Sequence, residues 1–145
     1  MIVKMKMQVT PEEYFEFIIE HLLAELPKSM QKKITKKDIK TGLKYRQTYK
    51  LAKGDFVSKK EITEFEYGVI YKLQMEIPDG FQYIEHRIEK LSDNEIEVNY
   101  EESLDSSKAS TSIFHKIKSG SSKKQMKQRL AAIEEYIITK REEAE

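Results

Sequence analysis

Apolar residues recur with two different periods along the chain, and the change of period separates the predicted helices from the predicted strands. Near the C-terminus, Met126, Leu130, Ile133 and Ile137 follow one another at helical spacing, and most residues between them are charged or polar. This spacing places the four residues on one stripe of a helix. We therefore predict a long helix over residues 121–141 that packs through this stripe onto another element.

The N-terminal segment predicts a strand followed directly by a helix. Apolar residues alternate with polar ones from Val3 to Val9, which is typical of a strand with one buried face. Thr10 then offers a capping hydroxyl, Pro11 suits the first helical position, and Glu13 can complete a capping box. These signals define the predicted start of the helix.

A short connector follows this helix. Pro27 ends the predicted helix, because its ring cannot continue the backbone hydrogen-bond ladder. Between Lys28 and Gly42 the apolar periodicity weakens, and Thr35 with Asp38 offers a second, poorer capping box. We predict one or two short helical turns that end at Gly42.

Alternating runs separated by turn residues fill the middle of the chain. These runs span residues 43–51, 56–65, 69–77, 83–89 and 95–101. Because the connections are short, we predict that successive strands pair as an antiparallel meander. The polar residues 58–61 inside the second run indicate an edge strand or a solvent-facing surface. A seventh strand has room only near residues 110–117.

Together these elements predict one α+β domain over residues 1–145. A chain of 145 residues is long enough to bury a single core. The predicted architecture is a curved antiparallel sheet, of about six or seven strands, wrapped around the long C-terminal helix. The N-terminal strand and helix and the short helical connector precede the meander.

The composition excludes several kinds of site and indicates a compartment. The chain has no cysteine, which excludes disulfides, thiolate metal sites and a cysteine nucleophile. No apolar run reaches the length of a membrane-spanning helix, and Lys4 and Lys6 interrupt the region where a signal peptide is apolar. We predict a soluble, cytoplasmic protein, and the residues indicate no cofactor.

Charge is distributed unevenly, although the net charge is only +1. Residues 28–53 carry ten basic residues and one acidic residue, whereas residues 54–105 carry five basic and fourteen acidic residues. The basic block can face solvent, pair with the acidic strands, or bind a polyanion or a protein. No nucleic-acid recognition motif accompanies it, so nucleic acid is not the expected partner, and a protein partner stays open. The block consists of Lys32, Lys33, Lys36, Lys37, Lys40, Lys44 and Arg46.

Few residues are candidates for catalysis, ligand contact or metal binding. His86 lies between Ile84 and Ile88 on one face of a predicted strand, where it can contact a ligand, act as a general base or be a hydrogen-bonded core histidine. Glu102 lies on the same side as Tyr100, and it can enter the mouth of a cavity or end the strand in solvent. The three histidines lack the spacing of metal ligands, so we predict no metal site.

Three short motifs carry a family resemblance. They are VTPEEYF at residues 9–15, the run Ile84, His86 and Ile88 with Leu91, and the group Val98, Tyr100 and Glu102. The first motif, together with the order of predicted elements, resembles the helix-grip fold shared by START domains and the Bet v 1 type of plant allergens, the SRPBCC superfamily. More narrowly, the chain resembles a family of short Gram-positive bacterial proteins, a domain of unknown function (DUF3284).

This resemblance implies a cavity between the sheet and the C-terminal helix, which in relatives holds lipids, sterols, polyketides or other apolar molecules. It therefore implies that the protein binds an apolar or amphipathic small molecule without covalent catalysis. Two alternatives stay open. The protein can be a structural or regulatory interaction protein with a filled cavity or, third, an enzyme such as a cyclase or dehydratase that uses His86 and Glu102. The large inward-facing residues that can line or fill the cavity are Tyr45, Tyr71, Met75, His86, Tyr100, Met126 and Leu130.

Overall fold

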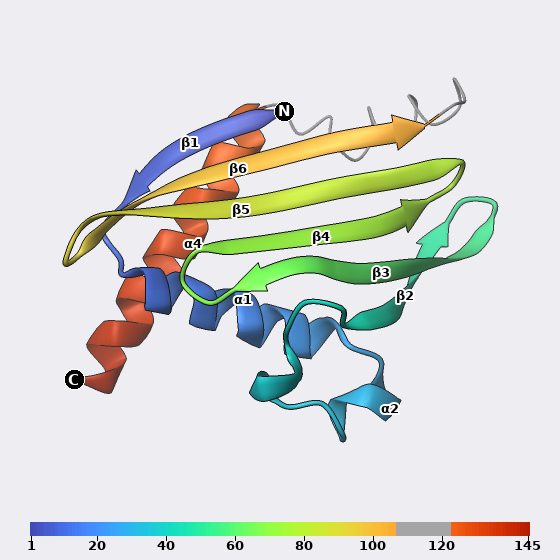
Figure 1. Ribbon diagram of the computed structural model, residues 1–145, viewed down its shortest axis with the longest axis horizontal. Coiled ribbons are helices and arrows are strands. Elements are labelled where there is room, and N and C mark those ends of the chain that lie inside the picture. Colours follow the sequence, from blue (N-terminus) through green and yellow to red (C-terminus); the bar gives the residue numbers. More distant parts are fainter. Residues whose placement is uncertain (107–122) are drawn as a thin grey trace.

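A curved six-stranded antiparallel sheet forms the body of the protein, and two helices, α1 and α4, pack against it (Figure 1). The computed structural model describes residues 1–106 and 123–145. The strands are β1 (Ile2–Met7), β2 (Lys44–Leu51), β3 (Gly54–Glu66), β4 (Ile70–Ile77), β5 (Gly80–Ser92) and β6 (Glu95–Ser106). The helical elements are α1 (Pro11–Glu25), α2 (Lys28–Gln31), the 3-10 turn η1 (Lys36–Asp38) and α4 (Lys123–Ala144).

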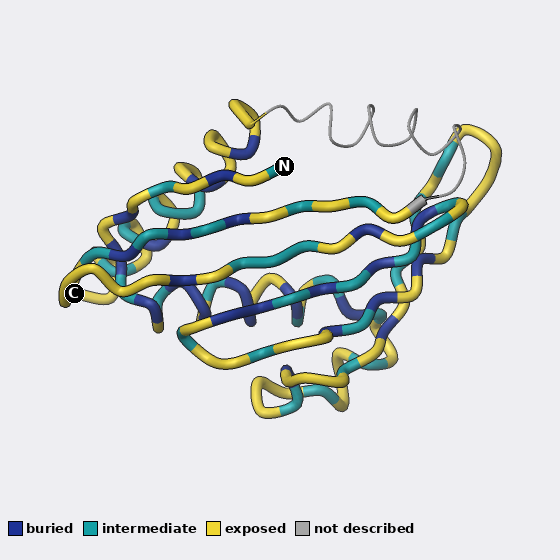
Figure 2. Tube along the Cα trace, turned by 45° about the horizontal axis from the view of Figure 1, so that its top comes forward, coloured by how far each residue is buried: buried dark blue, intermediate teal, exposed yellow. Residues whose placement is uncertain are grey.

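The strands are arranged as the alternating pattern predicts. Their order in the sheet is β1-β6-β5-β4-β3-β2, so β2 to β6 form a meander and β1 pairs with β6. Buried and exposed residues alternate along these strands (Figure 2). The α+β fold with a curved antiparallel sheet and a long C-terminal helix is therefore confirmed. The region proposed for a seventh strand, residues 110–117, lies outside the described residues.

The prediction that residues 58–61 form an edge strand is wrong, and the alternative of a solvent-facing surface holds only for Lys59, which is exposed, and for Glu61, which is partly exposed. β3 lies between β2 and β4, and the two edges of the described sheet are β1 and β2. Ser58 is fully buried, and its hydroxyl donates a hydrogen bond to the carbonyl oxygen of Glu76 at 2.6 Å. Lys60 is buried as well. The period of two that continues to Ile62, and not the polarity of the residues, decides which side chains face inward.

Helix α1 begins as its sequence predicts. The Thr10 hydroxyl accepts a hydrogen bond from the Glu13 amide at 3.1 Å, and the Glu13 carboxylate accepts one from the Thr10 amide at 2.8 Å. This reciprocal pair is a capping box, which satisfies backbone donors that the first helical turn leaves free. The helix ends before Pro27, and the connector then forms α2 and η1, two short turns as expected.

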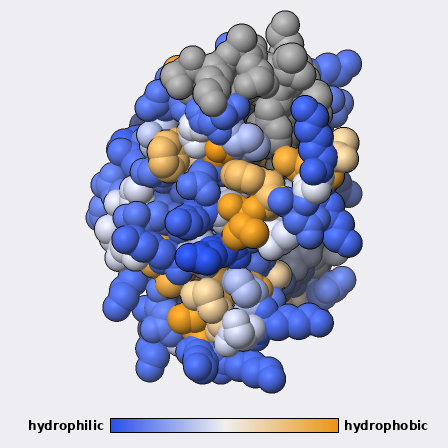
Figure 3. Space-filling view, turned by 90° about the vertical axis from the view of Figure 1, so that its right-hand side faces the viewer, coloured by the Kyte–Doolittle hydropathy of each residue, from blue (hydrophilic) through white to orange (hydrophobic). Residues whose placement is uncertain are grey.

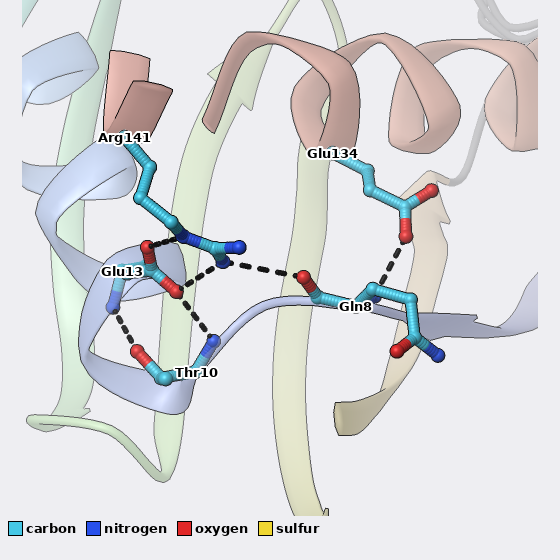
Figure 4. Close-up of polar contacts among 5 residues, drawn as sticks. All are labelled: Gln8, Thr10, Glu13, Glu134 and Arg141. Atoms are coloured by element: carbon cyan, nitrogen blue, oxygen red, sulfur yellow. Dashed lines mark hydrogen bonds and ion pairs between the residues drawn. The ribbon is translucent and has the colours of Figure 1, made fainter. Parts of the chain in front are cut away.

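A polar tether joins the end of α4 to the start of α1 (Figure 4). Arg141 donates two hydrogen bonds of 2.8 Å to the Glu13 carboxylate and one of 3.2 Å to the carbonyl oxygen of Gln8. Two turns earlier on α4, Glu134 accepts a hydrogen bond from the Gln8 amide at 2.7 Å. We call Gln8, Glu13, Glu134 and Arg141 the helix tether. It fixes how α4 lies across the β1–α1 turn.

Helix α4 is longer than predicted at its C-terminal end. It extends from Lys123 to Ala144, and the expected first residue, Ser121, lies outside the described part of the chain. Met126, Leu130 and Ile137 are buried in the hydrophobic core, and Ile133 packs partly buried against it. The apolar stripe therefore packs against the sheet and α1, as its spacing predicts. Within residues 1–106 and 123–145, no helix has the length and apolar character needed to cross a membrane.

A candidate ligand site on the concave face of the sheet

The strand register shows which side chains share the concave face. Residues that pair directly across antiparallel strands point to the same side of the sheet. Tyr45 pairs with Lys60, Lys60 with Met75, Met75 with Gln82, and Gln82 with Leu104, so these five residues form one row across five strands. We call it the lysine row. It contains two of the predicted cavity residues, Tyr45 and Met75.

A second row holds three more of the predicted residues. Tyr71 pairs with His86, His86 with Tyr100, and Tyr100 with Val3 on β1. The His86 ring lies 5.6 Å from the Tyr71 ring and 5.0 Å from the Tyr100 ring, measured between centroids. We call this the histidine row. The structure thus brings Tyr71, His86 and Tyr100 into direct contact, although they come from three different strands.

Helix α1 covers the histidine row and shows that it lies on the concave face. The Tyr14 hydroxyl forms a hydrogen bond of 2.7 Å with Nδ1 of His86, and the two rings lie 5.9 Å apart. Burial lowers the pKa of His86 to about 4 and raises the pKa of Tyr14. Both groups are therefore uncharged at neutral pH. A base with a pKa of about 4 is poorly matched to proton abstraction near pH 7, which weakens the enzyme alternative.

Glu102 lies near the histidine row on the Tyr100 side, as its position in the sequence suggests. The Tyr100 hydroxyl donates a hydrogen bond of 2.7 Å to Oε1 of Glu102. The second carboxylate oxygen, Oε2, is buried and has no hydrogen-bond partner among the residues that the structure describes. The N-terminal ammonium of Met1 donates to the Glu102 carbonyl oxygen at 2.7 Å, which brings the start of β1 beside this carboxylate. If Glu102 ended the strand in solvent, both of its carboxylate oxygens would face water.

Lys60 places a positive charge within the lysine row. Its side chain is only 4% exposed, and its ammonium donates a hydrogen bond to Oε1 of Gln47. The ammonium also lies 5.2 Å from the centre of the Tyr49 ring and 5.9 Å from that of Tyr45, close enough for cation–π attraction. The Glu25 carboxylate of α1 is 4.0 Å away. Lys60 is a candidate site residue that the sequence analysis did not name, although its spacing of two from Ile62 indicates an inward side chain.

Glu25 links Lys60 to a second basic group. It accepts a hydrogen bond of 3.4 Å from the Tyr45 hydroxyl and lies 3.2 Å from Nε2 of His21. Burial favours its neutral form, but the hydrogen bond from His21 and the charge of Lys60 outweigh this effect and lower the pKa of Glu25. The same hydrogen bond raises the pKa of His21. One carboxylate is therefore shared by Lys60, His21 and Tyr45.

A pocket opens beside the lysine row, with a volume of about 640 Å³. This volume falls within the range of roughly 300–1,000 Å³ that is usual for small-molecule sites. Figure 3 views the end of the molecule opposite α4, where apolar residues gather at the centre and hydrophilic residues surround them. The pocket is lined by Pro27, Ser29, Met30, Lys44, Tyr45, Arg46, Lys59, Lys60, Glu61, Gln74, Glu76 and Phe81.

The two predicted residues from α4 lie in the core. Met126 is 6% exposed and Leu130 is fully buried. They belong to the same hydrophobic cluster as Tyr45, Tyr71 and Tyr100. In the described residues, no three His, Asp or Glu side chains gather in a way that could hold a metal ion. The groups that the candidate site offers are therefore tyrosine hydroxyls, neutral His86, one buried ammonium and the partly buried carboxylates of Glu25 and Glu102.

Comparison with solved structures identifies the fold. The crystal structure of Ara h 8.0201, a Bet v 1 allergen, matches with a TM-score of 0.63 at 11% identity, covering 96% of this chain and 97% of that one. A conserved protein from Geobacillus kaustophilus matches with a TM-score of 0.60 at 16% identity, covering 95% and 94%. A protein from Chromobacterium violaceum matches with a TM-score of 0.53 at 13% identity, covering 94% and 96%. The fold is therefore Bet v 1-like.

Comparison of the sequence identifies the family. No curated protein matches the chain. Residues 1–121 match the family described as a domain of unknown function (DUF3284), which covers the sheet and α1. Its description assigns no chemistry. The narrower resemblance of the three sequence motifs is confirmed, and the chain belongs to the DUF3284 family.

Proposed function

We propose that the protein binds an amphipathic small molecule on the concave face of its sheet, between the sheet and α4. The Bet v 1-like fold is compatible with small-molecule binding. In this proposal the lining consists of the predicted residues Tyr45, Tyr71, Met75, His86, Tyr100, Met126 and Leu130, and we add Lys60 because its side chain shares the concave face with Tyr45 and Met75.

The observation that carries the proposal is the polar character of an otherwise buried face. A core that serves only stability is formed mainly from apolar side chains, because burying a polar group without a partner costs free energy. Here Lys60 places an ammonium, paired with Gln47 and Glu25, on this face, and Glu102 places a buried oxygen without a partner among the described residues. A ligand with polar and apolar parts would satisfy both kinds of surface.

The alternative is an interaction protein whose interior is filled by its own side chains. Tyr45, Tyr71, Met75 and Tyr100 are each no more than 6% exposed, which is compatible with close packing. The two functions differ in whether a small molecule can enter. A test of entry therefore decides between them.

Native mass spectrometry of the purified protein tests the proposal directly. We expect a species heavier than the chain, whose extra mass is released when the protein is unfolded. The neutral fluorophore N-phenyl-1-naphthylamine should also bind, because its aromatic body suits an apolar pocket. A cavity-filling variant, Met75→Trp, should reduce this binding, whereas Val57→Trp on the outer face should not, since Val57 is 45% exposed. Absence of both a co-purifying molecule and fluorophore binding would favour the interaction protein.

A further inference from the structure

We propose that the open edge of β1 is a docking site for an acidic segment of another protein, which binds in extended form and adds a strand to the sheet. This surface lies at the rim of the sheet and is separate from the proposed small-molecule site. Two kinds of contact recognise the partner. Its backbone forms hydrogen bonds with β1, and its carboxylates meet the lysines of an adjoining groove.

The backbone of β1 presents unpaired positions to the edge of the sheet. The Glu102 amide donates to the Met1 carbonyl oxygen, and the Met1 nitrogen donates to that of Glu102, so these residues form a hydrogen-bonded pair. Such pairs alternate along antiparallel strands, so the odd-numbered residues of β1 bond to β6. The N–H and C=O groups of Ile2, Lys4 and Lys6 therefore point away from β6.

The helix tether agrees with this direction. Gln8 continues the even-numbered series just beyond β1, and its amide and carbonyl groups bond to Glu134 and Arg141. Lys4 and Lys6 have no strand neighbour on this side, because β1 is an edge of the described sheet. An extended chain can pair with such an edge as a further strand.

A groove runs along this edge, between β1 and the first turns of α4. Figure 1 shows α4 passing behind the sheet and reaching the β1 edge with its N-terminal turns. The volume of the groove is about 750 Å³. A strand added to β1 would lie in this groove, with one of its faces toward α4. Among the described residues, the groove is lined by Lys4, Met5, Lys6, Lys124, Lys127, Gln128 and Ala131.

The charge of the groove is positive, since its described lining contains lysines and no acidic residue. The Lys4 and Lys6 side chains project to the outer face of β1, and Met5 projects to the concave face. Lys124 and Lys127 are exposed on α4. An added strand would therefore meet lysines on both of its faces, which favours carboxylates in the partner. The partly buried Met5 adds an apolar contact.

The same lysines disfavour two other occupants of this edge. A second copy of the chain that paired through β1 would bring the lysines of the two strands side by side, which is destabilising. Residues 107–122 of this chain contain lysines and no acidic residue, so their charge does not complement the groove. An acidic segment of another protein has the complementary charge.

Fluorescence anisotropy with labelled peptides tests both kinds of contact. The probe is a peptide of about eight residues in which Glu and Val alternate, long enough to cover β1. Only alternate residues of an added strand direct their N–H groups to β1. N-methylation of one alternate set should therefore weaken binding about tenfold, and N-methylation of the other set less than about twofold, although the charge is unchanged. A peptide with Lys in place of Glu should not bind.

Variants of Lys4 separate strand pairing from charge. Lys4→Gln removes one charge and keeps the backbone N–H, whereas Lys4→Pro removes both. Proline is compatible with this position because the N–H points away from β6. We expect Lys4→Pro to bind the Glu-Val peptide about tenfold more weakly than Lys4→Gln does. Lys50→Gln, an exposed position on the opposite edge strand β2, is the control for net charge and should change the affinity less than about twofold.

Amide hydrogen exchange of the wild-type protein gives a second measurement, which decides if Lys4→Pro does not fold. The bound peptide should slow exchange at Lys4 and Lys6, whose amides point outward. Exchange at Val3 and Met5 should stay unchanged, because these amides already bond to β6.

Four results would overturn the inference. The first is no binding of the Glu-Val peptide at low salt. The second is an equal effect of the two methylation patterns, which would indicate charge attraction without strand pairing. The third is tighter binding of single-stranded oligothymidylate with the same number of charges, which would indicate a general polyanion site. The fourth is protection of β2 amides alone, which would place the peptide on the opposite edge. None of these results tests small-molecule binding on the concave face.

Discussion

At the scale of single residues, His86 shows how burial changes the chemistry of a side chain. The sequence allows it to be a base, a ligand contact or a core histidine. In the structure it is surrounded by Tyr14, Tyr71 and Tyr100, and its pKa falls to about 4. Neutral imidazole with a tyrosine partner is suited to hydrogen bonding and packing, and it is poorly suited to act as a base near neutral pH.

This pKa predicts a pH dependence of stability. Between the unfolded pKa of about 6.5 and the folded pKa of about 4, the unfolded chain binds a proton at His86 that the folded chain does not. Stability should therefore fall as the pH is lowered through this window. His86→Gln should remove a loss on the order of 2–3 kcal/mol between about pH 7 and pH 4.5, measured by urea unfolding at each pH.

His21 should affect the pH dependence of stability in the opposite direction to His86, and it therefore serves as a control. Its hydrogen bond to Glu25 raises its pKa, so its contribution is present below the unfolded pKa and is lost as the pH rises through the folded pKa. His21→Gln should reduce stability more at acidic than at neutral pH. If both histidine variants changed the pH profile in the same direction, the assignment of His86 as a buried neutral group would be wrong.

At the scale of elements, the helix tether joins two ends of the chain that are distant in the sequence. Arg141 forms an ion pair with Glu13, 128 residues earlier. We expect Arg141→Met to lower the free energy of unfolding by about 0.5–1 kcal/mol, because the Arg141 side chain is partly exposed and its ion pair is screened. Lys127→Met on an exposed part of the same helix should have a smaller effect. Equal unfolding midpoints in urea for the two variants would contradict the tether.

The apolar stripe of α4 makes a larger contribution. Leu130 is fully buried, so Leu130→Ala should lower the free energy of unfolding by about 2–5 kcal/mol through lost contacts and the cavity that remains. Leu91→Ala, at a position that is 40% exposed, should change it by less than about 0.5 kcal/mol. Denaturant titrations of both variants measure this difference. Similar losses would mean that α4 does not form part of the core.

Local signals in the sequence predict most of these elements. The Thr10–Glu13 capping box and the period of the α4 stripe depend on residues close in sequence, and the structure confirms both. The Arg141–Glu13 pair depends on how two helices meet, which no local pattern encodes. The position of Lys60 is only partly predictable from the sequence. Its alternation with Ile62 indicates an inward side chain, but its charge suggests a solvent-facing one.

At the scale of the whole molecule, the curved sheet brings separate strands together into the candidate site. The histidine row draws Tyr71, His86 and Tyr100 from three strands, and its composition could be anticipated from the alternating faces of the strands. The pocket could not, because it depends on how the connector containing α2 lies against β2 and β3. The alternation of side chains therefore predicted which residues share the concave face, whereas the pocket required the three-dimensional arrangement.

In the proposed function, a small molecule binds on the concave face of the sheet. The six methionines of the chain allow a direct measurement, by NMR of ¹³C-labelled methyl groups during titration with N-phenyl-1-naphthylamine. We predict that the signals of Met75 and Met126 shift with ligand, while that of Met7, at the tethered end of β1, stays unchanged. Saturating ligand that leaves Met75 and Met126 unshifted would contradict binding between the sheet and α4.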